Sequence, residues 1–107
     1  MRLWLDDLRT PPDDTWTWVK TIEEAIPLLR AGEVEEASLD NDLGEHIPEG
    51  RKLVLWMAEH DTWPTRAIRV HSANPVSVEY MEGVIERYGP FERVGRTQRF
   101  VRLEQPA

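Results

Sequence analysis

The chain has 107 residues, enough for one domain built around one hydrophobic core. It contains no cysteine, which excludes disulfide scaffolds, thiolate zinc sites, iron–sulfur clusters and cysteine nucleophiles. Its 13 basic and 20 acidic side chains give a net charge of −7, so we expect no broad nucleic-acid-binding surface. Without a membrane-length apolar run or a signal pattern, the sequence predicts a soluble, cytoplasmic protein that binds no membrane.

The charges are unevenly distributed along the chain. Residues 1–64 carry 6 basic and 15 acidic side chains, whereas residues 65–107 carry 7 basic and 5 acidic ones. The basic side chains of the second segment gather near its end, at Arg87, Arg93, Arg96, Arg99 and Arg102. This end of the chain is therefore a candidate contact for a small phosphate.

Two short strands are predicted at the start of the chain. Residues 2–5 form an apolar run that Asp6 and Asp7 interrupt, which indicates a buried strand ending at the two acids. Residues 10–15 contain two prolines and two aspartates, a composition typical of a turn. Residues 16–19 predict the second strand. The linker is too short for a helix, so an extended parallel crossover and a hairpin both remain open.

The next segment has the pattern of a capped helix. Thr21 and Glu24 have the spacing of a capping box, apolar residues follow at helical spacing up to Leu29, and Gly32 ends the element. Pro27 lies too deep for the first turn, so we expect it to kink the helix or to shift its start.

The rest of the chain alternates strands and helices. The sequence Asn74-Pro75 is typical of a helix start, and Gly89-Pro90 is typical of a helix end. In chain order, the remaining predicted elements are a strand at 37–39, a helix at 51–60, a strand at 67–70, a helix at 75–88 and a strand at 99–103. This order predicts an α/β fold with an open, mainly parallel sheet of five strands.

Polar side chains follow three of the predicted strands. In open parallel sheets, ligands bind beyond the carboxyl ends of the strands. If the first, third and fourth strands are neighbours, as in flavodoxin-like folds, the polar residues at their ends face one crevice. These residues are Asp6 and Asp7 after the first strand, Asp40 and Asp42 after the third, and His71, Ser72 and Asn74 after the fourth.

Four carboxylates in one crevice repel one another. At an effective dielectric constant near 20, each pair separated by ~6 Å costs about 3 kcal/mol. Three outcomes relieve this repulsion: protonation, rotation of the acids into solvent, or a bound divalent cation. Oxygen ligands alone favour Mg²⁺, Mn²⁺ or Ca²⁺ over zinc. We predict a cation with Asp7 and Asp40 as its most direct ligands, and with Asp6 and Asp42 completing the set.

Each residue also has a purely structural interpretation. Asp6-Asp7 is typical of a turn that ends a strand, His71 of a partly buried structural histidine, and Asn74 of a helix cap. Residues 40–44 lack the third ligand position and the closing glutamate of an EF-hand loop. The functional interpretation depends on the fact that polar residues follow the carboxyl ends of three separate strands.

The sequence resembles a known family at these positions. Asp6 and Asp7, Asp40, and Ser72 are similar to the acidic pair, phosphoacceptor aspartate and hydroxyl residue of response-regulator receiver domains. The closer resemblance is to the cyclic-phosphate processing receiver domains, in the segments LWLDDLR, SLDNDLG and VHSANP, and it covers residue 1 to about residue 88. It implies a single receiver-like domain over residues 1–107 in which the first receiver helix is missing.

Two departures from the family pattern concern the site. Asn41 stands where the family usually has histidine between the two aspartates. Receivers also end their fifth strand with a lysine, whereas the only lysines here are Lys20 and Lys52, which leaves Arg99 or Arg102 as a candidate substitute.

The resemblance implies a metal-dependent phosphoesterase activity on cyclic phosphates, such as RNA ends bearing 2′,3′-cyclic groups, in RNA processing or repair. His71 is a candidate proton donor or acceptor, and the helix that begins at Pro75 is expected to offer free backbone N–H groups to the phosphate. Whether Asp40 attacks phosphorus or only binds metal stays open. The expected site comprises catalytic Asp40, His71 and Ser72, substrate contacts Ser72, Asn74 and Arg9, and Mg²⁺ or Mn²⁺ ligands Asp6, Asp7, Asp40 and Asp42.

Two other classes of function stay open at this point. One is a non-catalytic or phosphorylatable receiver-like module that signals by binding a partner protein. The other is a small adaptor whose exposed tryptophans form its working surface.

Overall fold

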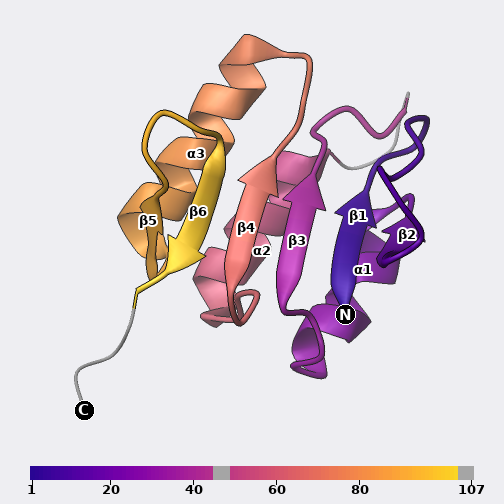
Figure 1. Ribbon diagram of the computed structural model, residues 1–107, viewed down its shortest axis with the longest axis horizontal. Helices are drawn as coiled ribbons and strands as arrows, with labels where there is room; N and C mark the ends of the chain where they lie inside the picture. The colour runs from indigo at the N-terminus through magenta and orange to yellow at the C-terminus, as the bar shows by residue number, and fades with distance from the viewer. Residues whose placement is uncertain (45–48, 104–107) are drawn as a thin grey trace.

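The computed structural model describes residues 1–44 and 49–103, which form one open sheet and three helices (Figure 1). The strand order is β2-β1-β3-β4-β6-β5. The strands are β1 (Arg2–Leu5), β2 (Trp16–Val19), β3 (Glu36–Leu39), β4 (Ala67–Val70), β5 (Phe91–Arg93) and β6 (Arg99–Arg102). The helices are α1 (Ile22–Arg30), α2 (Gly50–His60) and α3 (Pro75–Tyr88).

The first four strands are parallel, as predicted for a receiver-like sheet. β1 lies between β2 and β3, and β3 pairs with β4, so the ends of β1, β3 and β4 are neighbours. The pairing of Leu5 with Val19 on one side and with Leu39 on the other fixes this register. The linker between β1 and β2 contains no helix, and the two strands pair in parallel, which decides against the hairpin.

The sheet has six strands rather than the predicted five. β5 was missed because its three residues lie between Gly89-Pro90 and Val94-Gly95, too short a span to show alternation of apolar and polar residues. β5 and β6 form an antiparallel hairpin, and β6 pairs antiparallel with β4. The sheet is therefore mainly parallel but ends in an antiparallel edge.

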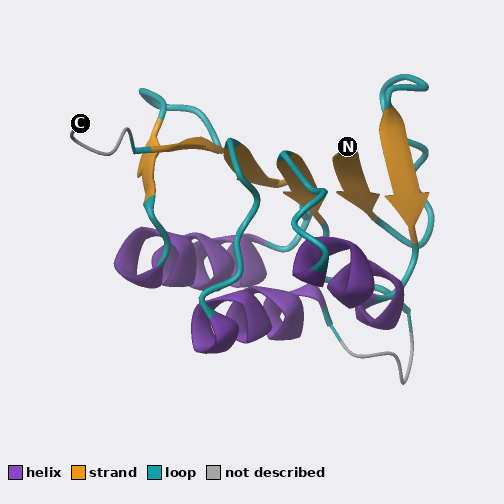
Figure 2. Cartoon of the chain, turned by 90° about the horizontal axis from the view of Figure 1, so that it is seen from below, coloured by secondary structure: helices purple, strands orange, loops and turns teal. Residues whose placement is uncertain are grey.

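All three helices lie on one face of the sheet (Figure 2). Side chains alternate between the faces of a strand, so Leu3 and Leu5 enter the core beneath β1 while Trp4 faces the opposite side. The fully buried side chains Leu53 of α2 and Ile85 of α3 close the core from the helical layer. The other face of the sheet carries no helix among the described residues.

The helix boundaries follow local signals in the sequence. The Thr21 side chain accepts a hydrogen bond from the backbone N–H of Glu24, as the capping box predicts. α1 begins where the sequence predicts and continues through the exposed Pro27, so the predicted shift of its start is wrong. Gly32 adopts a positive φ of 73° directly after the C-cap, a conformation that glycine tolerates without strain. None of the described helices combines the length and the apolar composition needed to cross a membrane.

We expect Gly50→Ala to destabilise the fold and to displace Asp40. A Cβ atom added to Gly50 would lie 1.9 Å from the backbone oxygen of Asp40 and 3.2 Å from Cα of Asn41, and backbone atoms cannot rotate away. The free energy of unfolding should fall by at least about 2 kcal/mol, measured by urea denaturation.

Gly83→Ala is the matched control for this substitution. Gly83 lies within α3, and a Cβ added there meets no atom within 4 Å. This variant should gain about 1 kcal/mol of stability from the higher helix propensity of alanine. Equal urea midpoints for Gly50→Ala and the wild type would contradict the close packing of α2 against the loop after β3.

Candidate functional site

Three carboxylates meet at the carboxyl edge of the sheet. Asp6 and Asp7 follow β1 and Asp40 follows β3, and one oxygen of each lies within 4.8 Å of the others. Asp6 and Asp40 retain only 1% and 8% of their accessible surface, while Asp7 is half-buried. With Arg9 and Asp42 they line a cleft of about 330 Å³. The structure thus brings together the three acids at two of the predicted strand ends.

The carboxylate of Asp6 is held by three hydrogen bonds. Its Oδ1 accepts from the backbone N–H groups of Leu8 and Arg9 at 2.9 and 2.8 Å, and its Oδ2 lies 3.0 Å from Nε2 of His71. Burial alone would raise the pKa of Asp6, but the hydrogen bonds from Arg9, Leu8 and His71 outweigh burial and lower this pKa. Asp6 is therefore ionised at neutral pH, and Oδ2 keeps one lone pair for a further ligand.

Asp40 is poorly compensated by comparison. Burial and then the negative charge of Asp6 raise the pKa of Asp40, against the opposing hydrogen bonds from the Asn41 backbone and the Ser72 side chain. Among residues 1–44 and 49–103, no lysine or arginine forms an ion pair with Asp7 or Asp40. Two buried carboxylates and one half-buried carboxylate offer oxygen ligands, and among the described residues no lysine or arginine pairs with Asp7 or Asp40. This combination suits a hard divalent ion.

His71 is joined to the acidic cluster through Asp6 but does not line the cleft. Its ring stacks on Trp4, with centroids 4.0 Å apart and an interplanar angle of 7°. Burial lowers the pKa of His71 despite the opposing effect of Asp6, so the ring is neutral at neutral pH. We therefore assign Nε2–H as the donor to Asp6 and Nδ1 as the acceptor of the Ser38 hydroxyl, 2.7 Å away.

Ser38 and Trp4 were not singled out by the sequence analysis. Trp4 lies two residues before Asp6, and Ser38 lies two residues before Asp40. Side chains two positions apart on a strand share a face. The alternation of side chains between the two faces of a strand therefore predicts that both residues lie on the same face as the acids.

Two residues after β4, Ser72 and Asn74, form hydrogen bonds within the chain. The Ser72 side chain contacts the Asp40 carboxyl, and its Oγ accepts from the N–H of Asn74 at 3.2 Å. Oδ1 of Asn74 caps α3 by accepting from the N–H groups of Val76 and Ser77, at 3.1 and 3.3 Å. The expectation of free N–H donors at this helix start is therefore wrong, because the cap already uses them.

Asp42 and Asn41 have different roles in the loop after β3. Asp42 is exposed at the rim of the cleft, and its Oδ1 accepts from the side-chain amide of Asn41 at 3.1 Å. Asn41 is buried, and its Oδ1 and backbone oxygen accept from the N–H groups of Arg51 and Gly50, at 3.2 and 2.8 Å. Asn41 thus ties the loop to the first turn of α2.

The basic residue beside the acids is Arg9. It lines the cleft, and its Nη1 donates to the backbone oxygen of His71 at 3.0 Å. Arg99 lies 3.5 Å from Glu36, and Arg102 donates to the backbone oxygen of Pro64. Neither arginine lines the cleft, so neither replaces the receiver lysine. The antiparallel direction of β6 carries Arg102 to the opposite edge of the sheet.

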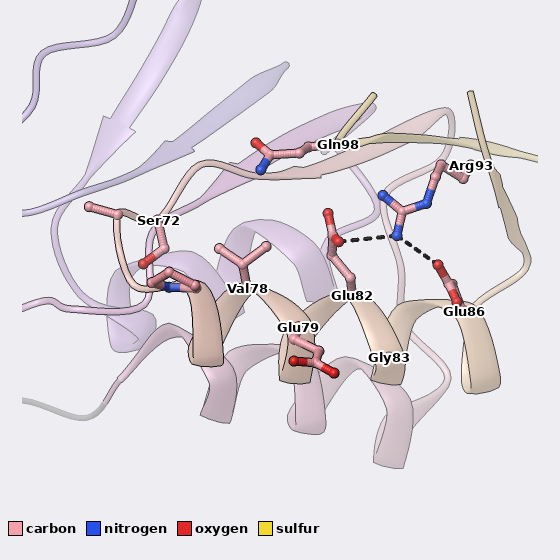
Figure 3. Close-up of a pocket in the computed structure, with 10 residues that line it drawn as sticks. Ser72, Val78, Glu79, Glu82, Gly83, Glu86, Arg93 and Gln98 are labelled. Atoms are coloured by element: carbon pink, nitrogen blue, oxygen red, sulfur yellow. Dashed lines mark hydrogen bonds and ion pairs between the residues drawn. The ribbon is translucent and has the colours of Figure 1, made fainter. Parts of the chain in front are cut away.

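A larger hollow of about 620 Å³ lies beside α3 (Figure 3). Ser72 lies at one end of it and Arg93 at the other. Nη2 of Arg93 bridges Glu82 and Glu86 at 3.1 and 2.8 Å, and these hydrogen bonds raise the pKa of the Arg93 guanidinium. The ion-pair network fastens β5 to α3, a structural role that accounts for these charged side chains.

We expect Asp40→Asn to stabilise the cation-free protein. The amide oxygen can still accept from the Asn41 N–H, while one charge of the crowded cluster is removed. In EDTA at pH 7 the free energy of unfolding should rise by about 1 kcal/mol or more. Because folding raises the pKa of Asp40, its ionised form opposes folding, so the advantage of the variant should shrink as the pH falls through that pKa. A variant less stable than the wild type in EDTA would contradict the repulsion between these acids.

We expect Asp7→Asn to weaken binding of Mg²⁺ and Mn²⁺ at least about tenfold, because it removes one of three negative oxygen ligands. Isothermal titration calorimetry measures the affinity. Asp14→Asn is the matched control, since Asp14 is exposed in the linker before β2 and outside the cleft. If both variants lost affinity for the ion equally, the loss would come from the change in net charge, which would contradict a direct role for Asp7.

Comparison with known proteins gives one match to a family. The model of the cyclic-phosphate processing receiver domain matches residues 1–87, which include β1 to β4, all three helices except the last residue of α3, and every acid of the cluster. No curated protein and no solved structure matches the chain. The chain belongs to the family of cyclic-phosphate processing receiver domains.

Proposed function

We propose that this protein is a metal-dependent phosphoesterase that opens cyclic phosphates, with RNA ends bearing 2′,3′-cyclic phosphates as its substrate class. The observation that carries this proposal is the cleft in which Asp6, Asp7 and Asp40 meet, with no lysine or arginine of the described residues in an ion pair with Asp7 or Asp40. The description of the family supports cyclic phosphates as substrates, and RNA ends are our choice among them.

In this proposal, Asp6, Asp7 and Asp40 hold Mg²⁺ or Mn²⁺. The cation supplies positive charge that stabilises the phosphoryl oxygens as negative charge builds on them. Arg9 lines the same cleft, and its guanidinium has further N–H donors besides the one that binds the His71 backbone. These donors suit a non-bridging phosphoryl oxygen.

The reaction replaces one ester bond of the ring with a bond to water. The oxygen of water forms a bond to phosphorus, the bond from phosphorus to one sugar oxygen breaks, and the product is a phosphomonoester. One proton of the water is lost, and the leaving sugar oxygen gains one, so the exchange needs a single group that accepts and returns a proton.

We assign this proton exchange to His71. Because His71 does not line the cleft, the proton would reach its neutral ring through the Ser38 hydroxyl, which gives its own proton to Nδ1 and takes another in return. The imidazolium that results would be stabilised by the carboxylate of Asp6 at Nε2. Asp6 itself then stays ionised and keeps its place in the cluster.

A phosphorylatable receiver module is the second candidate. The observation in its favour is the position of Asp40, which lies at the end of a strand beside two acids and in contact with the Ser72 side chain. In this alternative a carboxylate oxygen of Asp40 forms a bond to the phosphorus of a phosphodonor, the bond from phosphorus to the donor's oxygen breaks, and the donor leaves without its phosphoryl group, as acetate does from acetyl phosphate. The arrangement of these acids and Ser72 resembles that of signalling receivers. The lysine of those receivers has no counterpart among the described residues that line the cleft.

We expect purified protein with Mg²⁺ or Mn²⁺ to convert 2′,3′-cyclic mononucleotides into phosphomonoesters, measured by chromatography. EDTA should abolish turnover, and Asp40→Asn should lower kcat/KM at least about 100-fold, because a ligand charge close to the reacting phosphate is lost. Asp14→Asn should retain wild-type activity.

Intact-mass measurement after treatment with acetyl phosphate separates the two candidates. The phosphoesterase should show no stable added phosphoryl group, whereas the receiver module should show one that Asp40→Asn removes. Absence of turnover on every cyclic phosphate, or equal turnover by the wild type and Asp40→Asn, would discard the enzymatic proposal.

A further inference from the structure

A groove of about 490 Å³ lies on the face of the sheet that none of the described helices covers. This volume lies within the range of pockets that bind small molecules. The side chains that line it include Arg2, Trp4, Trp16, Glu36, Arg69 and Arg99. They come from β1, β2, β3, β4 and β6, so the groove crosses most of the sheet.

The groove and the acidic cleft share one face of the strands. Trp4 and Ser38 line the groove, and two positions further along the same strands lie Asp6 and Asp40 of the cleft. His71 lines the groove, stacks on Trp4 and lies 3.0 Å from Asp6. A ligand lying along the groove would therefore end beside the carboxylates.

The groove is basic on a chain whose net charge is −7. Three arginines line it with one glutamate, and that glutamate, Glu36, already lies 3.3 Å from Arg2 and 3.5 Å from Arg99. Arg69 is exposed and forms no ion pair within the part of the chain that the structure describes. The local charge thus complements an anion of low charge.

Indole rings make up the other part of this face. Trp16 is partly exposed, contacts Trp4 edge-to-face with centroids 5.6 Å apart, and has the Arg2 guanidinium 3.9 Å above its ring. Trp18 pairs with Trp4 in the sheet and retains 37% of its accessible surface. Exposed aromatic rings beside arginines are the combination that stacks the bases of single-stranded nucleic acids.

We propose that the groove binds the single-stranded nucleotides that precede the terminal phosphate of an RNA substrate. Bases stack against the partly exposed indole of Trp16, and Arg69 contacts a backbone phosphate, while the end of the strand reaches the cleft past His71. This inference rests on the proposed function for the identity of the terminal group. Recognition of the preceding nucleotides depends only on the groove.

The test measures binding without catalysis. The probe is a 5′-fluorescein-labelled hexaribonucleotide ending in a 3′-phosphate, titrated with protein in EDTA and followed by anisotropy. Arg69→Gln should weaken binding about threefold to tenfold at low salt and reduce the slope of log affinity against log salt by about one. Trp16→Leu should weaken binding at least about fivefold with little change in that slope.

Arg87→Gln is the matched control, because Arg87 is an exposed arginine of α3 on the helical side of the sheet. It should bind as the wild type does. Urea denaturation checks that each variant is folded. Should Trp16→Leu fail this check, the comparison of Arg69→Gln with Arg87→Gln decides the test.

Three results would overturn the groove proposal. These are equal binding by Arg69→Gln and Arg87→Gln, competition by inorganic polyphosphate as strong as that of the oligonucleotide, and a wild-type dimer that Arg69→Gln dissociates while no RNA binds. Groove-dependent RNA binding without hydrolysis of any cyclic phosphate would instead overturn the proposed function alone. Hydrolysis of cyclic mononucleotides with no groove-dependent RNA binding would overturn the groove alone.

Discussion

The repulsion between Asp6 and Asp40 is the interaction around which this edge of the molecule is organised. The register of β1 and β3 forces the two acids to leave the sheet side by side, and burial of both strengthens the repulsion. The fold stabilises only one of them fully, through two backbone N–H groups and His71 on Asp6. Asp40 is left with a raised pKa. A positive charge bound beside Asp40 would therefore stabilise its ionised form.

His71 connects this point to the rest of the sheet. One ring nitrogen faces Asp6 and the other faces Ser38, while the flat side of the ring lies on Trp4. These three contacts fix the ring and, through it, the orientation of the Asp6 carboxylate. The indole N–H of Trp4 in turn donates to the backbone oxygen of Arg9 at 2.8 Å, which ties the loop after β1 to the same stack. The cleft is thereby supported from the uncovered face of the sheet.

Local signals in the sequence were sufficient for much of the fold and for the centre of the site. The apolar run before Asp6, the capping box at Thr21 and the Asn74-Pro75 helix start each depend on residues close in sequence, and each is confirmed. The clustering of Asp6 with Asp40 also follows once the strands are taken as parallel neighbours. These features can be predicted from local propensity and from the rule that parallel neighbouring strands end at the same edge of a sheet.

The remaining features depend on contacts between distant segments. The strand direction of β6 carries Arg102 away from the site, and nothing in its own sequence indicates that direction. The N–H groups at the start of α3 were expected to be free, although the same asparagine that marks the helix start consumes them. The stack of His71 on Trp4 joins the residue after β4 to a residue of β1, two strands that are not neighbours, and no local pattern indicates such a contact.

The one-sided placement of the helices separates stability from recognition. Side chains such as Leu5 and Ile68 belong to the hydrophobic core and contribute to the stability of the fold. Side chains at the intervening positions, such as Arg69, face outward and are outside the hydrophobic core. Outward side chains that lie apart from the stack of Trp4 and His71, such as Arg69, can therefore change to suit a new ligand while the core composition stays the same. The absence of a described helix on this face leaves its side chains accessible to ligands.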